Sequence, residues 1–220
     1  MSISQNIDKV LKSIPKNVKL IAVSKTKPQE DIVEAYEGGY KIFGENKPQE
    51  LKQKFEALPK DIEWHFIGHL QTNKVKYIAG FVQLIHAVDS MKLLQEINKQ
   101  ALKHNRVINC LLQFHIAQEE TKFGYSLQEA IEMLNSEEFK SLEGINIVGV
   151  MGMATFTDNQ DQVRAEFKQL KLNFEALKTE FFHDKTDFVE ISMGMSGDYQ
   201  LAIEEGSTMV RVGSSIFGSR

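Results

Sequence analysis

A lysine follows the first apolar run of the chain, and its position makes it a candidate for covalent chemistry. The run LIAV at 20–23 is bounded by Lys19 and, a few residues later, by Pro28, which is typical of a buried strand. Lys25 stands at the carboxyl end of this run, where a side chain reaches the rim of a sheet. An amine held there could attack a carbonyl carbon, whereas an ordinary strand-end lysine is solvated.

Two segments near the carboxyl terminus have the composition of anion-binding loops. The segment 192–197 reads SMGMSG and the segment 213–215 reads GSS, and each follows an apolar run. Glycine lets backbone amides approach an anion, and serine hydroxyls donate to it. Arg211 lies just before the second segment, and strand alternation puts it on the face opposite its two valine neighbours. If that face is the inner one, Arg211 and Lys25 point into the same cavity.

The elements that must position these residues alternate along the chain. Eight runs have strand character: 19–25, 40–46, 63–69, 81–88, 108–116, 145–153, 187–194 and 209–218. Amphipathic stretches lie between them: 29–37, 48–58, 74–78, 90–104, 127–134, 160–182 and 198–205. This alternation favours a parallel sheet covered by helices, and eight strands are the number that closes a barrel. We therefore predict an α/β fold in which residues 1–220 form a single (β/α)8 TIM barrel with no second domain.

A barrel of this kind predicts where the chemistry lies. Active sites of such barrels lie at the carboxyl ends of the strands, and phosphate groups bind to the loops after strands seven and eight. Lys25 ends the first predicted strand, Asn46 ends the second, and the two Gly/Ser segments end the seventh and eighth. An amine, an anion cradle and a guanidinium then converge. Pyridoxal 5'-phosphate (PLP) needs this set, for its aldehyde, its phosphate and its ring nitrogen.

Composition argues against several other classes of protein. The 220-residue chain has a formal net charge of −4 and no long run of like charges, which is atypical of nucleic-acid binding. Its single cysteine, Cys110, cannot form an internal disulfide, which favours the reducing cytoplasm. The first 17 residues have helical spacing and not the pattern of a signal peptide. His65 and His69 bracket a predicted strand without a third ligand, so we predict no metal site.

Several strings, in order along the chain, carry a family resemblance. They are AVSKTKP at 22–28, FGEN at 43–46, WHFIGHLQTNK at 64–74, HAVDS at 86–90, MGMAT at 151–155 and ISMGMSGDYQLAIEEGSTMVRVGSSIFG at 191–218. Together they resemble the pyridoxal phosphate homeostasis protein family, whose members are single-domain relatives of the alanine racemase barrel. The resemblance covers the chain from about residue 20 onward and implies a PLP-binding barrel of fold type III.

The resemblance implies seven cofactor-binding residues: Lys25, Asn46, Ser192, Met193, Arg211, Gly213 and Ser214. In that scheme the lysine carries PLP as a Schiff base, and the asparagine lies in the cofactor pocket. The serines, the methionine backbone and the glycine bind the phosphate, and the arginine faces the pyridine nitrogen. Lys122 resembles a family lysine that handles cofactor in transit. His115 departs from the family pattern, which often has an asparagine near this position.

An arginine beside the ring nitrogen implies weak carbanion chemistry, because a guanidinium can only donate and keeps that nitrogen unprotonated. The resemblance also implies that racemases with this arrangement take a second base from a further domain of the partner subunit, which we do not expect here. We therefore expect a cytoplasmic, monomeric or weakly dimeric, non-catalytic PLP carrier that supplies apo-enzymes. The alternatives are a slow PLP-dependent amino-acid racemase and a cofactor-free Schiff-base aldolase.

Overall fold

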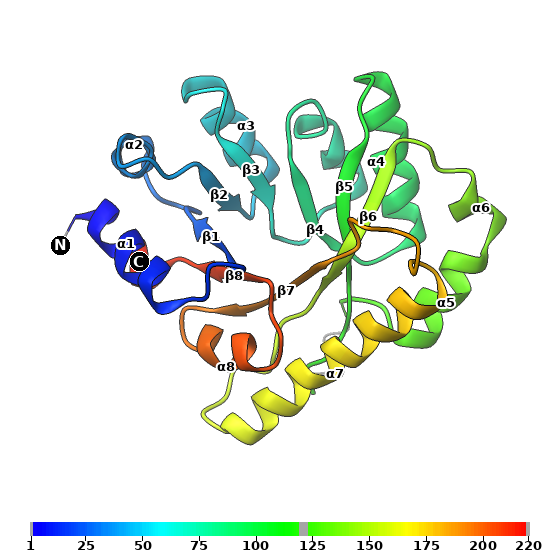
Figure 1. The fold of residues 1–220 in the computed structure, drawn as a ribbon. Coiled ribbons are helices and arrows are strands. Elements are labelled where there is room, and N and C mark those ends of the chain that lie inside the picture. Colours follow the sequence, from blue (N-terminus) through cyan, green and yellow to red (C-terminus); the bar gives the residue numbers. More distant parts are fainter. Residues whose placement is uncertain (1, 119–122, 219–220) are drawn as a thin grey trace.

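Eight parallel strands close into a barrel in sequence order (Figure 1). The computed structural model describes residues 2–118 and 123–218. The strands are β1 (Lys19–Val23), β2 (Ile42–Glu45), β3 (Glu63–Phe66), β4 (Leu84–Val88), β5 (Ile108–Gln113), β6 (Ile145–Met151), β7 (Glu190–Met195) and β8 (Met209–Val212). β8 pairs with β1 and closes the ring. The predicted α/β fold class and its barrel are confirmed.

Helices surround the barrel, as the amphipathic stretches predict (Figure 1). They are α1 (Ile3–Ser13), α2 (Gln29–Glu37), α3 (Pro48–Ala57), the 3-10 helix η1 (Thr72–Tyr77), α4 (Met91–Lys103), α5 (Leu127–Asn135), α6 (Glu137–Lys140), α7 (Gln160–Glu180), α8 (Tyr199–Glu204) and α9 (Ser214–Phe217). Ser90 and Ser126 cap the amino termini of α4 and α5 with their hydroxyls, which explains why these helices begin where they do. No helix in the described ranges is long and apolar enough to cross a membrane.

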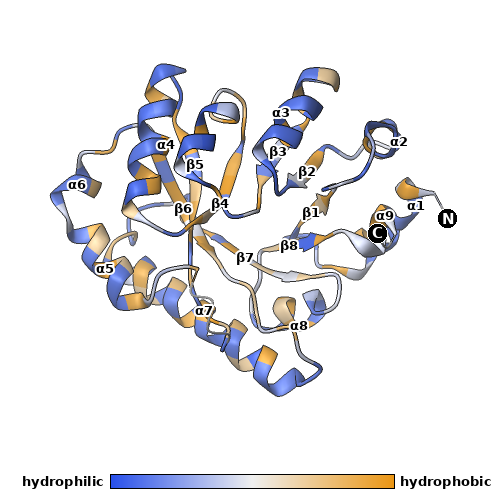
Figure 2. Cartoon of the chain, turned by 180° about the vertical axis from the view of Figure 1, so that it is seen from behind, coloured by the Kyte–Doolittle hydropathy of each residue, from blue (hydrophilic) through white to orange (hydrophobic). Residues whose placement is uncertain are grey.

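The strands are buried on both faces, which divides the apolar side chains into two clusters. The larger cluster joins strand residues such as Leu20 to helix residues such as Ile32 and Leu51. The smaller one consists of residues from or beside strands, among them Ile21 and Met209, and fills the barrel interior. Figure 2 shows apolar strands inside a shell of helices whose surfaces are largely hydrophilic. This double burial is the usual condition of a parallel sheet. Because all eight strands run parallel, their carboxyl ends lie at the same rim of the barrel.

Gly149 marks the closest approach of β6 and β7. It pairs with Glu190 in the sheet, and a Cβ atom built on it would lie 1.8 Å from the Glu190 carbonyl oxygen. Only a residue without a side chain lets these two backbones pair. The contact therefore depends on glycine for space and not only for backbone freedom.

We predict that Gly149→Ala lowers the free energy of unfolding by about 3 kcal/mol or more, because the strands must separate to admit the methyl group. The matched control is Gly39→Ala, where nothing lies within 4 Å of the added Cβ atom and only a positive φ of 92° opposes the change. That control should lose about 1 kcal/mol. Urea denaturation measures both, and equal losses would contradict the steric explanation.

Candidate functional site

A cavity of about 500 Å³ opens at the carboxyl ends of the strands. The segments that follow β1, β2, β6, β7 and β8 line it, which is where barrels of this kind hold their ligands. Five of the seven residues predicted from the sequence lie on its wall: Lys25, Asn46, Arg211, Gly213 and Ser214. The fold thus brings together residues from both ends of the chain.

Lys25 lies in a tight turn directly after β1. The turn runs from the fully buried Ser24 through the half-buried Lys25 to Thr26, whose φ of 66° is in the left-handed region. Lys27 also lines the cavity, and its Nζ atom donates a 2.8 Å hydrogen bond to the Phe217 carbonyl oxygen. The second lysine is therefore held toward α9, at the carboxyl-terminal end of the described chain.

Asn46 brings an unsatisfied acceptor to the cavity wall. Its side-chain Oδ1 atom is buried, and none of the described residues donates to it. Gly68 packs closely against the backbone of Asn46, where a Cβ atom on this glycine would lie 2.5 Å from the Asn46 carbonyl oxygen. A buried acceptor without a donor costs about 1–3 kcal/mol. The site therefore fits a ligand that carries a donor, as the hydroxyl-bearing ring of PLP does.

Arg211 points into the barrel, which answers the question that strand alternation left open. It is 4% exposed, and Nη1 donates to the carbonyl oxygen of Ser192 at 2.8 Å and to its hydroxyl at 2.6 Å. Nη2 donates to the Gly152 carbonyl oxygen at 3.1 Å. Burial lowers the pKa of Arg211 to about 10, so the guanidinium stays charged at neutral pH. It presents a fixed positive donor group at the floor of the cavity.

Ser192 and Met193 are placed differently from the other predicted residues. Both are fully buried in β7, and neither is among the residues that line the cavity. The Ser192 hydroxyl is already bound to Arg211 and to His86. The strand runs on to Met195 before the rim is reached, so the loop that faces the cavity begins after the residues expected from the sequence.

The loop after β7 and the start of α9 form one polar wall. Ser196 and Gly197 line the cavity together with Gly213 and Ser214, and the Gly213 amide donates to the Ser196 hydroxyl at 3.1 Å. These four small residues supply amides and hydroxyls of the kind that bind a phosphate group. Asp198 also lines the cavity beside them, and burial raises the pKa of its carboxyl group.

A chain of buried polar groups extends from Arg211 toward the other end of the barrel. His86 Nδ1 lies 2.9 Å from Ser192 Oγ, and His86 Nε2 lies 3.0 Å from His65 Nδ1. Burial lowers the pKa of His65 to about 3 and holds that of His86 well below its usual value. Both imidazoles are therefore neutral at pH 7. His86 is not among the site residues that the motifs implied, although its place in the apolar run 84–88 was a signal of burial.

The family resemblance also drew attention to Lys122 and His115. Lys122 lies outside the described residues. His115 is half-buried and follows β5, where its amide donates to the Tyr125 carbonyl oxygen at 3.1 Å. It is not one of the residues that line the cavity.

Comparisons of the sequence with known proteins agree with the family resemblance found in its motifs. The family model for the alanine racemase N-terminal domain matches residues 1–220. The chain is 42% identical to the pyridoxal phosphate homeostasis protein of Aquifex aeolicus over 203 residues, which cover 92% of this chain and 87% of that protein. It is 35% identical to the protein of the same name from Escherichia coli K12 over 210 residues, with coverage of 94% and 87%.

Comparison with solved structures agrees with the comparison of sequences. PipY of Synechococcus elongatus PCC7942, a COG0325 family member solved with PLP bound, is 32% identical and has a TM-score of 0.88, covering 99% of this chain and 100% of PipY. Alanine racemase from Bartonella henselae is only 15% identical, with a TM-score of 0.71, covering 99% of this chain and 58% of the racemase. The second likeness shows the shared fold alone.

The buried histidine pair predicts that the protein loses stability in mild acid. In the unfolded chain each imidazole takes up a proton below a pKa of about 6.5, whereas the folded state resists protonation down to a pKa of about 3 for His65. Stability contributed by the pair is therefore complete above pH 6.5 and falls as the pH falls below it. Between pH 7 and pH 5.5 each histidine should remove about 1 kcal/mol from the free energy of unfolding.

Urea denaturation at the two pH values measures this loss. His65→Asn should make it smaller by about 1 kcal/mol, because one of the two titrating groups is gone. His183→Gln is the control, since that side chain is 65% exposed, and it should leave the loss unchanged. The same pH dependence in both variants would show that the pair is not its source.

Proposed function

We propose a function from one premise: the chain belongs to the pyridoxal phosphate homeostasis protein family, which has the alanine racemase N-terminal fold. We infer that this protein binds PLP in the rim cavity, keeps it bound in reserve and gives it up to enzymes that need it. The observation that carries the proposal is the convergence of Lys25, Arg211 and the four small residues of the polar wall on one cavity. The presence of PLP in the structure of the relative PipY supports it.

Lys25 is the proposed point of attachment. Its Nζ atom would bond to the aldehyde carbon of PLP, forming a C=N bond while the aldehyde oxygen leaves as water. The lysine lies on the cavity wall at the end of β1, and Lys27 is held at the Phe217 carbonyl oxygen instead. This Schiff base is reversible, which a store of cofactor requires.

The other residues of the cavity wall would bind the remaining polar groups of PLP. Asn46 Oδ1 would accept from the ring hydroxyl, and Arg211 would donate to the ring nitrogen without protonating it. We propose that the phosphate lies against Ser196, Gly197, Gly213 and Ser214, which all line the cavity. Ser192, which the family resemblance placed at the phosphate together with Met193, would instead hold Arg211 through its carbonyl oxygen and its hydroxyl.

The lining of the cavity favours storage over catalysis. Its described residues include no histidine, tyrosine or cysteine that could serve as a second base. Three apolar side chains on its wall, Met153, Phe156 and Met195, are 42%, 98% and 38% exposed, so the mouth is open to water and to incoming amines. We propose a monomer that acts in the cytoplasm, where its one cysteine stays reduced.

The first test is spectroscopic. PLP bound to the protein should give the visible absorption band of a Schiff base, and Lys25→Ala should abolish it. Lys27→Ala is the matched control and should keep the band, because its amine does not form the C=N bond. A visible band of full strength in Lys25→Ala would refute the attachment proposed here.

The second test separates a carrier from an enzyme. The loaded protein, mixed with the apo-form of a PLP-dependent enzyme, should restore that enzyme's activity. Alanine should racemise no faster than with free PLP, since the described lining of the cavity offers no histidine, tyrosine or cysteine as a second base. Racemisation that requires Lys25 and proceeds at an ordinary enzymatic rate, about 1 per second or more, would show that the protein is a racemase instead.

A further inference from the structure

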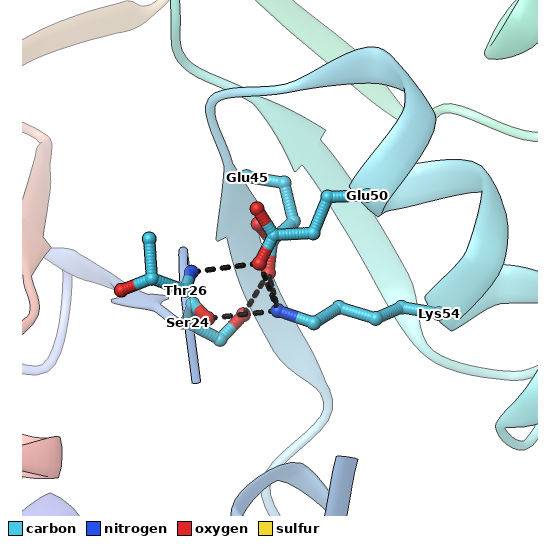
Figure 3. Close-up of polar contacts among 5 residues, drawn as sticks. All are labelled: Ser24, Thr26, Glu45, Glu50 and Lys54. Atoms are coloured by element: carbon cyan, nitrogen blue, oxygen red, sulfur yellow. Dashed lines mark hydrogen bonds and ion pairs between the residues drawn. The ribbon is translucent and has the colours of Figure 1, made fainter. Parts of the chain in front are cut away.

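The turn that carries Lys25 is fastened on both sides by side chains from the neighbouring strand and helix (Figure 3). Before Lys25, the Ser24 hydroxyl donates to Glu45 Oε1 of β2 at 2.6 Å. After it, the Thr26 amide donates to Glu50 Oε1 of α3 at 2.7 Å. The backbone can therefore not rotate at either neighbour of the lysine without breaking a hydrogen bond to a carboxylate.

Lys54 lies at the centre of these contacts. Its Nζ atom donates to Glu45 Oε1 at 2.7 Å, to Glu50 Oε1 at 2.7 Å and to the Ser24 carbonyl oxygen at 2.9 Å. An ammonium group has three N–H donors, and all three are used here. The side chain is only 5% exposed, so the contacts replace its water shell and tie α3 to the turn after β1.

The turn adopts a conformation that it would not hold alone. Thr26 has a φ of 66°, and this left-handed region costs a residue with a Cβ atom about 1–2 kcal/mol. Such strained positions persist where the surrounding structure determines them and occur preferentially at functional sites. In this protein the determining contact is the one from the Thr26 amide to Glu50, which Lys54 in turn holds in place.

We propose that Glu45, Glu50 and Lys54 are positioning residues, which hold the turn so that the Lys25 amine is presented to the cavity in one orientation. None of the three lines the cavity, so they act through the backbone on either side of the lysine. Fixing an attacking group in advance removes the orientational part of its barrier. The inference rests on the proposed role of Lys25, and its consequences extend to the rate at which cofactor is captured and released.

Glu50→Ala is the most direct variant, because that side chain is 21% exposed and its loss leaves no large cavity. In the cofactor-free protein, exchange of the Thr26 amide hydrogen, followed by NMR, should accelerate about tenfold or more as its acceptor is lost. Glu50→Gln keeps an oxygen acceptor and should restore most of the protection. Glu56→Ala is the control on the same helix: among the described residues the Glu56 carboxylate pairs with the exposed Lys52 alone, at 3.5 Å, and its loss should change nothing at the turn.

The second measurement is the rate of covalent capture, followed as the growth of the visible band after mixing with PLP. Glu50→Ala, measured at a temperature where the variant is fully folded, should slow it about tenfold, with recovery in Glu50→Gln. Lys54→Met combined with Glu45→Gln, which removes the buried charges together, should slow capture similarly and covers the case in which a single substitution fails to fold.

The outcomes separate the two proposals. Unchanged Thr26 exchange in Glu50→Ala would overturn the positioning network. Faster exchange with an unchanged capture rate would show that the network serves stability alone, which also overturns it. If the wild-type protein itself forms no Lys25-dependent band, the proposed attachment fails, while the exchange measurement still reports on the turn.

Discussion

The pairing of β1 with β8 is the contact on which the site depends. Ala22 of β1 pairs with Val212 of β8, so the segments that follow these strands lie beside each other although nearly the whole chain separates them. Lys25 follows one strand and Gly213 follows the other, and both line the same cavity. Further contacts strengthen the closure: Asn6 Nδ2 donates to the Ile216 carbonyl oxygen at 2.8 Å, and Lys27 Nζ donates to the Phe217 carbonyl oxygen.

Two buried polar clusters support the site from different sides. One extends downward from Arg211 through Ser192 to the histidine pair and consists of neutral partners around a single charge. The other lies behind the Lys25 turn and joins one lysine to two carboxylates. Buried polar groups are stable only where partners satisfy them, and breaking such a cluster costs more than its net contribution. The first cluster holds the Arg211 side chain in one arrangement, and we propose that the second does the same for the turn that carries Lys25.

Local signals in the sequence predicted much of this structure. Alternating apolar runs revealed all eight strands, and Ser90 and Ser126 mark helix starts as hydroxyl caps do. Lys25 stood out because an amine at the end of a buried strand has a specific use. Period-two alternation put Arg211 on one face, but only the closed barrel shows that this face is the inner one. Such patterns are local, so a single sequence contains them.

The rest depends on contacts between distant segments. The family resemblance placed Ser192 at the phosphate, and it begins a Gly/Ser-rich segment, but β7 continues to Met195 and leaves Ser192 inside the barrel. Lys54 belongs to a polar helical stretch and has the pattern of a solvated lysine, yet the approach of α3 to the turn after β1 buries it. Register and helix docking decide both cases, and neither leaves a mark in the local sequence. Reducing the PLP-loaded protein with borohydride and mapping the modified peptide is the most direct test of attachment at Lys25. We expect the pyridoxyl group on Lys25, and its recovery on Lys27 or Lys122 instead would contradict that attachment.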